Sequence, residues 1–517
     1  MTALTARYDT RPPSKGPYSA IVYIDGSQVV AEDADGKVIA SRVAGVDDSA
    51  VMAAVAAALP NGGSIFLKKS ANAYTYVPTA KVVFKNDTFI YSDNAWIDAR
   101  SINDTVFEMG ADTDSDAERG YLAGLSGVHV LGCPTNNNTL LAKIINCSRG
   151  ARVENISANK VSNVIKLRGC CYSSTIKNVL CQNDVANTGS FIALEATNVS
   201  EMFPTNIELD HCEITGWNSS NQIGINILAS TAIVPQRPGV IIISNSYFEQ
   251  IGQCVHSEGN TLTIENSRFS KYDGNCIELI TKYINGVDIS GSGDNNSIVN
   301  CSFYIPETAG GHSIYVDAGA NNAISSRISN SYFYGGGSVN RPHIHNAGVY
   351  GMLLKLSDNE FSYTSNCIDG RVSYSTIIGN VFTSYLNAGT AIDLGTGSYD
   401  IIEGNAITNF ALGINAAGAY YPKIFGNNIR ACTTAISVAN ATGPQVDHNG
   451  GIVTEKSGSS TGTGAEQTIA HGLISTPSKV NIVPTQIGTI LYGLWADVTN
   501  IYPTVTNGKT FIWSAEV

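Results

Sequence analysis

A short pattern of apolar and polar positions repeats twelve times between Val153 and Val446: an aliphatic residue, two residues ending on Asn or another turn-former, then a large apolar residue. Ile243-Ser-Asn245-Ser-Tyr-Phe248 is a clear copy, and Ile377-Ile-Gly-Asn380-Val-Phe382 is a later one with the asparagine one residue further on. Successive aliphatic positions lie 23, 33, 34, 21, 34, 30, 28, 21, 25, 22 and 22 residues apart. A constant minimum with variable additions is typical of a solenoid whose coils carry loop insertions.

The spacing also predicts the type of solenoid. Two apolar residues around one turn-forming residue, with no run at helical spacing, predict short strands joined by bends. Asparagine tolerates left-handed backbone geometry, and asparagines at the same corner of successive coils can stack into an internal ladder. We therefore predict an all-β protein with a right-handed parallel β-helix over residues 45–455, and we expect Asn245, Asn266, Asn300 and Asn330 to stack at one corner.

The two ends of the chain have patterns of their own. Residues 1–44 contain two hairpin signals and predict a small N-terminal β element. Apolar residues at helical spacing, stopped by Pro60-Asn61-Gly62-Gly63, predict a capping helix over residues 49–58. Residues 456–464 have the composition of a flexible linker, and the short apolar runs in residues 465–517 predict a small C-terminal β-sandwich.

The start of the solenoid resembles a known family. Gly45-Val-Asp47-Asp48-Ser49, an alanine-rich helix, Gly62-Gly63, a strand and a Tyr-Thr-Tyr-Val segment resemble the opening of pectate-lyase-like β-helix proteins, which include many viral tail spikes. The resemblance implies that the helix plugs the N-terminal end of the solenoid. It also implies a homotrimer, with the N-terminal part directed toward a viral tail or baseplate protein and the C-terminal sandwich available for trimerisation or binding.

Composition limits the partners. The 517 residues carry a net charge of −12 and no basic stripe, which argues against nucleic acid and anionic membranes as partners. The sequence contains no 18-residue apolar run, so it predicts no membrane span. The first residues lack the apolar region of a signal peptide, so we expect synthesis in a cytoplasm. The 11 cysteines show no zinc-binding spacing, and we predict neither a metal nor a cofactor.

One strand of each coil predicts a surface column. In this strand the residue after an inward Ile or Val must point outward, because side chains alternate along a strand. The rungs read, in order, His256, Glu278, Tyr315, His345, Asp369, Asp393 and Asn415. We expect Asp369 and Asp393 on adjacent rungs, where two close carboxylates suit a glycosidase and their repulsion would raise one pKa. Glu278 is a third candidate catalytic acid, three rungs from Asp369 and placed to hold another sugar.

Other outward residues are candidates for substrate binding. Tyr304 and Tyr334 follow the large apolar residue on neighbouring rungs, and with Tyr315 they offer ring faces and hydroxyls to a sugar. His256 and His345 are candidate hydrogen-bond partners, and Arg371 is the candidate base of an eliminating lyase. Outward positions of a solenoid are polar in any case, and tyrosine favours strands, so ordinary solvated residues are the alternative throughout.

These patterns leave three functions open. The first is a viral tail spike that binds cell-surface polysaccharide and cleaves it, made in the host cytoplasm and acting from the virion at the host surface. The second is a non-catalytic receptor-binding fibre with the same surface. The third is a polysaccharide hydrolase or lyase of a free-living microbe. The fold alone does not separate them, because β-helices host both binding and catalysis.

Overall fold

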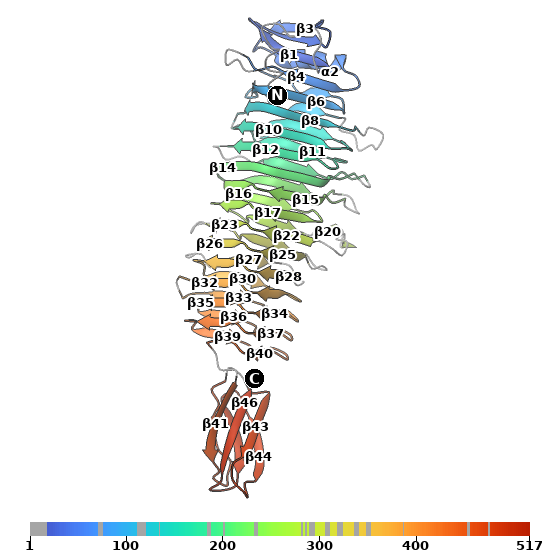
Figure 1. Ribbon diagram of the computed structural model, residues 1–517. Coiled ribbons are helices and arrows are strands. Elements are labelled where there is room, and N and C mark those ends of the chain that lie inside the picture. The colour runs from blue at the N-terminus through green and yellow to red at the C-terminus, as the bar shows by residue number, and fades with distance from the viewer. Residues whose placement is uncertain are drawn as a thin grey trace. The chain divides into compact units, whose positions relative to one another are not determined.

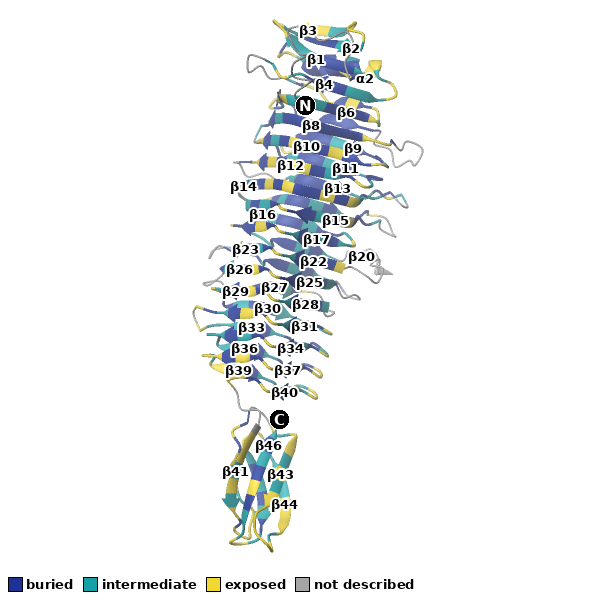
Figure 2. Cartoon of the chain, viewed as in Figure 1, coloured by how far each residue is buried: buried dark blue, intermediate teal, exposed yellow. Residues whose placement is uncertain are grey.

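The computed structural model describes residues 18–70, 76–110, 120–133, 135–183, 188–199, 202–231, 236–280, 283–284, 287–288, 295–305, 311–317, 324–335, 341–347, 353–385, 387–451, 455–473 and 476–516. The chain divides into an N-terminal unit, Met1–Asn322, and a C-terminal unit, Ala323–Val517. Parallel strands build most of both units (Figure 1). Buried side chains follow the inward positions of these strands (Figure 2). The structure thus confirms the predicted parallel β-helix.

The N-terminal unit starts with an antiparallel sheet that continues into the parallel sheet of the β-helix. Strands β1 (Ala20–Asp25), β2 (Gln28–Asp33) and β3 (Val38–Val43) pair antiparallel, and β1 pairs parallel with β4 (Gly63–Leu67). Because β4 pairs in turn with β6 (Thr88–Asp98), the hairpin residues are joined to the first coil by backbone hydrogen bonds. The residues before Tyr18 lie outside the described ranges.

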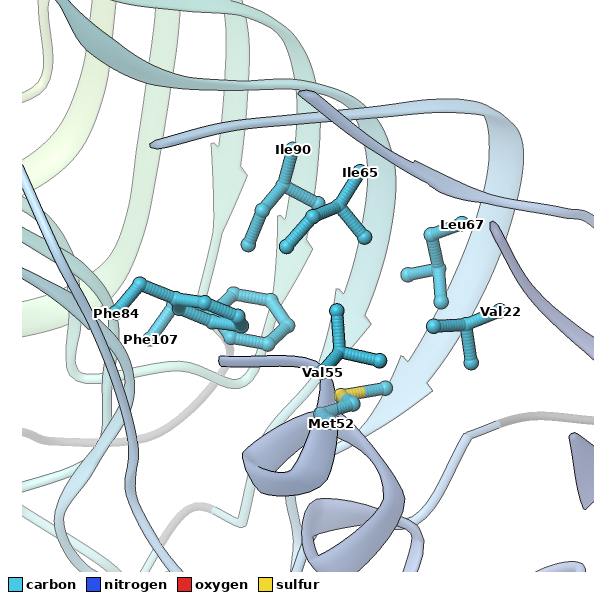
Figure 3. Close-up of a pocket in the computed structure, with 8 residues that line it drawn as sticks. All are labelled: Val22, Met52, Val55, Ile65, Leu67, Phe84, Ile90 and Phe107. Carbon is cyan, nitrogen blue, oxygen red and sulfur yellow. The ribbon is translucent and has the colours of Figure 1, made fainter. Parts of the chain in front are cut away.

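The predicted capping helix is α2, Asp48–Ala58. It buries Val51, Met52 and Val55. Met52 and Val55 face apolar residues of the first coils (Figure 3) across a void of about 10 Å³, which is at the lower limit for one water molecule. The buried Asp48 carboxylate accepts the backbone N–H of Gly45 at 3.0 Å and that of Val77 at 2.6 Å. This side chain therefore anchors the start of the helix to the chain on either side.

The coils of the N-terminal unit contain strands of three sheets. The first sheet contains β6, β8 (Ala123–Leu131), β10 (Ala151–Asn159), β12 (Thr175–Gln182), β14 (Thr205–Leu228), β15 (Gly239–Ser244), β17 (Leu262–Glu265) and β22 (Asn295–Val299). The second contains further parts of β6, β8, β10, β12 and β14 with β16 (Tyr247–Ser257), β18 (Arg268–Ser270) and β23 (Ser302–Ile305). The third contains β5 (Val82–Phe84), β7 (Thr105–Met109), β9 (Leu140–Ile145), β11 (Asn163–Arg168), β13 (Ser190–Glu195), parts of β14 and β16, β19 (Ile277–Ile280) and β24 (Ile314–Asp317). Strands β20 (Tyr283–Ile284) and β21 (Val287–Asp288) form a separate hairpin.

The C-terminal unit repeats the three strands in shorter coils. Its first sheet contains β25 (Ser325–Ser329), β28 (Leu353–Ser357), β31 (Thr376–Ile378), β34 (Ile401–Glu403), β37 (Lys423–Phe425) and β40 (Gln445–Asp447). Its second contains β26 (Tyr332–Gly335), β29 (Glu360–Ser362), β32 (Val381–Thr383), β35 (Ala406–Thr408) and β38 (Asn428–Arg430). Its third, called the acidic sheet below, contains β27 (Pro342–Asn346), β30 (Asn366–Gly370), β33 (Thr390–Asp393), β36 (Leu412–Asn415) and β39 (Thr434–Ser437).

The repeated phrase keeps one frame throughout, although its asparagine changes place. In the early copies Asn245, Asn266 and Asn300 stand at successive levels of one exposed corner with φ of 50°, 51° and 53°, and Asn330 has the same conformation in the C-terminal unit. In the later copies glycines such as Gly379 take this left-handed position, with φ of 67°. The asparagine then occupies the next position, which points into the helix.

The internal ladder is therefore one residue further along than we expected. The predicted corner asparagines point outward, because a left-handed residue turns its side chain away from the core at this bend. The buried ladder of the C-terminal unit consists of Asn359, Asn380, Asn405, Asn427 and Asn449. The Nδ2 atom of each of the first four donates to the Oδ1 atom of the asparagine in the next coil at 2.8–3.0 Å.

Six strands form the C-terminal sandwich. One sheet has the order β41 (Glu455–Thr461), β46 (Thr510–Glu516), β43 (Lys479–Pro484), and the other has the order β42 (Ile469–Ala470), β45 (Asn500–Val505), β44 (Leu491–Ala496). Ile501 and Val505 of one sheet share a core with Phe511 and Trp513 of the other.

The predicted linker over residues 456–464 is wrong for most of its length. Residues 455–461 are strand β41, paired antiparallel with β46 from Glu455↔Glu516 to Thr461↔Thr510. A Cβ atom at Gly458 would lie 2.9 Å from the Trp513 ring, so the absence of a side chain there makes room for the indole. Small residues in this segment thus serve packing against β46 rather than flexibility.

Candidate functional site

The acidic sheet presents one column of polar side chains. Ile344 pairs with Ile368, Ile368 with Ile392, and Ile392 with Ile414, and all four are buried. Because side chains alternate along a strand, the residue after each isoleucine points outward. The column on successive rungs is therefore His345, Asp369, Asp393 and Asn415, followed by Ser437.

Asp369 and Asp393 follow paired isoleucines, so they lie on adjacent rungs. The His345 Nδ1 atom is 3.5 Å from the Asp369 Oδ2 atom. The Asp393 Oδ1 atom accepts the backbone N–H of Gly395 at 2.9 Å, which ties this carboxylate to its own turn. Neighbouring strands are about 4.8 Å apart, so carboxyl groups one rung apart can reach the separations of about 5–9.5 Å that glycosidases use, and the rotamers set the distance.

A stack of tyrosines lines the corner where the chain enters the acidic sheet. Tyr334, Tyr363 and Tyr385 each follow the inward phenylalanine of the second sheet by one to three residues. The Tyr334 and Tyr363 ring centroids are 5.1 Å apart, and those of Tyr363 and Tyr385 are 5.2 Å apart. We call this the entry stack. Tyr332 extends it, with its ring 6.2 Å from that of Tyr334.

A second stack, the exit stack, lines the corner where the chain leaves the acidic sheet. It consists of Tyr374, Tyr399 and Tyr421, with both pairs of ring centroids 5.2 Å apart. All three are exposed, and their φ angles are 53°, 57° and 53°. Left-handed geometry costs a residue with a Cβ atom roughly 1–2 kcal/mol, and an aromatic pair returns about 0.5–1.5 kcal/mol. With three strained residues and two pairs, stacking therefore offsets only part of the backbone strain.

The two stacks border the carboxylate column on both sides. The strand between them, β30, is five residues long, or about 13 Å. Tyr363 and Tyr385, and the three rings of the exit stack, lie face to face with planes at 17–20°, whereas Tyr334 is tilted by 48° against Tyr363. The ring edges, the hydroxyl groups and the outer face of each end ring remain for a ligand. A polysaccharide presents hydroxyls along its whole length. The entry stack, the carboxylate column and the exit stack offer these hydroxyls three parallel rows of hydrogen-bond donors and acceptors.

Sequence reasoning identified Tyr334 but missed Tyr363, Tyr385 and all three members of the exit stack. Their signal was present, since Tyr374, Tyr399 and Tyr421 are 25 and 22 residues apart. These are the spacings of the neighbouring aliphatic repeat positions, so the tyrosines occupy one phase of the coil. Arg371, the candidate base of a lyase, is exposed next to Gly370 at the end of β30, and its backbone carbonyl accepts the Asn346 Nδ2 atom at 2.6 Å.

The predicted residues of the N-terminal unit also form a column. His256 pairs with Glu278, and Glu278 with Tyr315, on the third sheet of that unit. Glu278 accepts His256 Nδ1 at 2.7 Å and Gln253 Nε2 at 2.6 Å through Oε2, and Asn275 Nδ2 at 3.1 Å through Oε1. Burial disfavours its charge, but these donors keep the pKa of Glu278 below its usual value. An acid held ionised in this way does not suit the role of proton donor.

His256 lies between two glutamates. Its Nε2 atom is 3.8 Å from the Glu258 Oε1 atom, on the side opposite to Glu278. Burial opposes the charged imidazolium, yet hydrogen bonds and charge from Glu258 and Glu278 outweigh it and raise the pKa of His256 to about 9. The group is thus a positively charged structural centre of this sheet at neutral pH.

The remaining predicted residues lie at the surface of the N-terminal unit. Tyr304 is exposed on β23, beside Ser270 on the preceding rung. The Tyr315 ring centroid is 5.8 Å from that of His312, and burial, with the charges of Asp317 and Glu278, raises the pKa of Tyr315. Glu278 and Tyr304 belong to the N-terminal unit, and Asp369 and Tyr334 to the C-terminal one, so one continuous surface through all of them stays a prediction.

Two further properties concern the described residues alone. Within these ranges no group of three or more His, Cys, Asp or Glu side chains is placed to hold a metal ion. The one helix found there is too short to cross a membrane.

Several solved structures similar to this chain are phage proteins. A point mutant of the tailspike protein of E. coli bacteriophage HK620, in complex with a pentasaccharide, has a TM-score of 0.57 at 12% identity, over 94% of this chain and 92% of that one. A further structure of the HK620 tailspike protein with pentasaccharide has a TM-score of 0.51 at 12% identity over the same shares. Tailspike protein 3 of bacteriophage CBA120 has a TM-score of 0.46 at 12% identity, over 79% of this chain and 60% of that one.

Sequence comparisons add no relative. Neither a protein-family model nor a curated protein sequence matches the chain. The similarity is thus one of architecture, and it covers nearly the full length of both chains in the HK620 structures. The chain has the parallel β-helix fold of these phage tailspike proteins.

Proposed function

We propose that this protein is a viral tailspike that binds a cell-surface polysaccharide on the acidic sheet. The observation that carries the proposal is the column His345, Asp369, Asp393 and Asn415 between two tyrosine stacks. All three rows run from coil to coil, so the bound glycan lies along the helix axis and contacts several coils. The HK620 tailspike protein, which has this fold, was solved with a pentasaccharide.

In this proposal Asp369 and Asp393 hydrolyse the glycan. One carboxyl group protonates the oxygen of the leaving sugar, and the other activates water or attacks the anomeric carbon. His345 Nδ1 lies 3.5 Å from Asp369 Oδ2 and, when protonated, forms an ion pair with that carboxylate. Glu278, Tyr304, Tyr315 and His256 then serve as further sugar contacts in the N-terminal unit, and Arg371 contacts the glycan beside Asp369.

The same proposal includes assembly and location. The sandwich exposes several large apolar side chains, among them Ile487, which is 97% exposed, and Ile490. Exposed apolar surface of this kind typically marks a protein interface, which supports a homotrimer held partly by the sandwich. The N-terminal part would attach to a viral tail or baseplate protein, after synthesis in the host cytoplasm, and the protein would act on the host surface.

The test is incubation of the purified protein with surface polysaccharides of candidate hosts, followed by size-exclusion chromatography and a reducing-end assay. We expect one polysaccharide to be bound and shortened. Binding without shortening would replace the proposed hydrolase with the receptor-binding fibre. If the protein binds none of the surface polysaccharides of the hosts that the virus infects, the glycan proposal is wrong.

Assembly has its own test. Light scattering of the full chain at micromolar concentration should give three times the mass of 54.6 kDa. A chain ending at residue 451 removes all six sandwich strands without cutting the β-helix, and it should lose part or all of the trimer. A stable monomer of the full chain contradicts this part of the proposal and leaves the glycan site untouched.

A further inference from the structure

The C-terminal sandwich exposes an aromatic side chain that its surroundings hold in place. Trp495 on β44 is 50% exposed, although its ring is stacked on that of Tyr502 with centroids 3.7 Å apart and planes at 10°. Its Nε1–H donates to the Glu466 Oε2 atom at 2.8 Å. One ring face and the N–H edge are thus occupied, so the exposed half includes the opposite ring face.

The support of Trp495 is itself anchored. The Tyr502 hydroxyl donates to the Asp497 Oδ2 atom at 2.7 Å. Asp497 also accepts the backbone N–H of Thr499 at 2.8 Å and that of Asn500 at 2.7 Å. These backbone bonds, then the Tyr502 hydroxyl, lower the pKa of Asp497, so a charged carboxylate fixes the phenol ring beneath the indole. Because this platform is already ordered, binding a ligand does not cost the entropy of ordering its side chains.

The surface around the indole is shallow and polar. Trp495 pairs with Tyr502, and Gly493 with Thr504, across β44 and β45. Glu466 forms an antiparallel β-bridge with Thr504, on the edge of β45 away from β44. The Trp495 indole therefore extends across β45 to donate to the Glu466 carboxylate. Gly493 has no side chain, and a Cβ atom there would meet only the Thr504 Oγ1 atom, at 3.8 Å. This leaves an open floor with a hydroxyl and a carboxylate beside the indole.

This geometry points to a second glycan site on the sandwich: we propose that Trp495 binds the apolar face of a neutral pyranose, with Glu466 and Thr504 accepting or donating to its hydroxyls. The C–H face of a pyranose is apolar while its rim carries hydroxyls, which fits an indole face with polar groups at its edge. Two carboxylates near the platform disfavour an anionic sugar through charge repulsion. The site is separate from the acidic sheet and does not depend on the function proposed there.

A protein partner fits this face less well. A protein–protein interface has an apolar core in which charged residues are depleted. Here Glu466 accepts the Trp495 N–H, Thr504 pairs with Glu466, and Asn500 donates to the Tyr502 hydroxyl. The more apolar exposed residues of the sandwich, Ile487 and Ile490, lie in the loop between β43 and β44. The two surfaces therefore differ in chemistry, and a variant at one need not affect the other.

The experiment is saturation-transfer NMR of the full chain with methyl glucoside, methyl galactoside, methyl mannoside and methyl N-acetylglucosaminide, and with methyl glucuronide as the anionic probe. At least one neutral glycoside should bind, and Trp495→Ala should weaken that binding about tenfold, the loss of about 1.4 kcal/mol. Tyr492→Ala is the matched control, an exposed aromatic on the same strand, and should leave binding unchanged. Glu466→Gln should keep neutral binding, because its amide oxygen still accepts the indole N–H, and should increase binding of the glucuronide.

Two results would overturn the proposal. Equal binding of every neutral glycoside by wild type and Trp495→Ala excludes the platform. A changed mass of Trp495→Ala in light scattering shows that Trp495 is a subunit contact instead. Asp369→Asn separates the two glycan sites: it should not change the signal lost in Trp495→Ala, whatever its effect on polysaccharide cleavage.

Discussion

His345 and Asp369 lie on adjacent rungs of the acidic sheet, with Nδ1 of the imidazole 3.5 Å from Oδ2 of the carboxylate. When the imidazole is protonated the two groups form an ion pair, which favours this orientation of the Asp369 carboxylate. Asp393, on the next rung, is held instead by the backbone N–H of Gly395. The two carboxyl groups of the proposed reaction are thus positioned by different means.

Asp369→Asn and Asp393→Asn should each lower the rate of glycan cleavage by about 10² to 10⁴, because each removes one proton-transferring or attacking group. Glycan affinity should change by less than tenfold, since the amide keeps the shape and hydrogen-bonding capacity of the side chain. Reducing-end kinetics and calorimetry on the same polysaccharide measure the two effects. Full cleavage activity in the double variant would sink the catalytic assignment.

The tyrosine stacks should contribute to binding rather than to chemistry. Tyr399→Ala removes the middle ring of the exit stack and should weaken polysaccharide binding several-fold while the turnover of bound glycan changes little. Tyr334→Ala should act in the same way at the entry stack, and Tyr304→Ala in the N-terminal unit. Tyr121→Ala, an equally exposed tyrosine near the start of the helix, is the control. If all four variants bind alike, the stacks serve only to hold neighbouring coils together.

The coil frame could be predicted because it rests on burial. Inward isoleucines and phenylalanines recur at fixed positions in every coil, and alternation along a strand then places His345, Asp369 and Asp393 outward without further information. Positions set by burial and alternation were therefore within reach of the sequence.

Features set by contacts between coils could not be predicted from the sequence. Whether an asparagine points in or out depends on which residue takes the left-handed conformation, and this changes from Asn245 to Gly379 within one frame. The three donors that hold Glu278 ionised include Gln253 and Asn275, whose approach no periodicity indicates. Residues 456–464 have the serine- and glycine-rich composition of a linker. The need for glycine at Gly458, which the Trp513 ring contacts, becomes clear only once the two strands are paired.

A buried acid should make the C-terminal unit less stable at higher pH. Asp400 is fully buried; its Oδ1 atom accepts the Ser375 N–H at 2.9 Å, and Oδ2 has no hydrogen-bond partner. Burial raises the pKa of Asp400 from 3.8 to about 7. The folded protein therefore keeps a proton that the unfolded chain releases, and the free energy of unfolding falls by about 4 kcal/mol as pH rises from 4 to 7.

Asp400→Asn removes this titration and keeps the Ser375 bond. The variant should have a higher urea midpoint than wild type at pH 8, where the wild-type carboxyl is charged, and nearly the same midpoint at pH 4. Equal midpoints of the two proteins at both pH values would show that Asp400 is ionised in the fold without cost.

His256 should act over a different pH range. Its pKa is raised from 6.5 to about 9, so the folded protein binds this proton more tightly than the unfolded chain does. The stabilisation, about 3 kcal/mol, is fully present below pH 6.5 and is lost as pH rises through 9. His256→Gln should therefore destabilise the N-terminal unit strongly at pH 6 and much less at pH 10. His448→Gln, beside Asp447 but 80% exposed, is the control and should change stability little at either pH.

The buried asparagine ladder should tolerate substitution far less than the exposed corner. Asn405 donates through Nδ2 to the Ile377 carbonyl at 2.9 Å and to Asn427 Oδ1 at 2.9 Å, and its Oδ1 accepts from the Asn380 N–H and Nδ2. Asn405→Ala removes the Oδ1 acceptor of the buried Asn380 N–H and the donor to the Ile377 carbonyl, whereas Asn427 Oδ1 keeps the Asn405 backbone N–H and Asn380 Nδ2 keeps two carbonyls. An unsatisfied buried group costs about 1–3 kcal/mol, so we expect a loss of about 3 kcal/mol. Asn330→Ala, at the exposed corner, should cost only about 1 kcal/mol, from its left-handed φ of 51°. Urea unfolding of both variants measures the contrast, and similar losses would mean that water replaces the ladder bonds in the Asn405 variant.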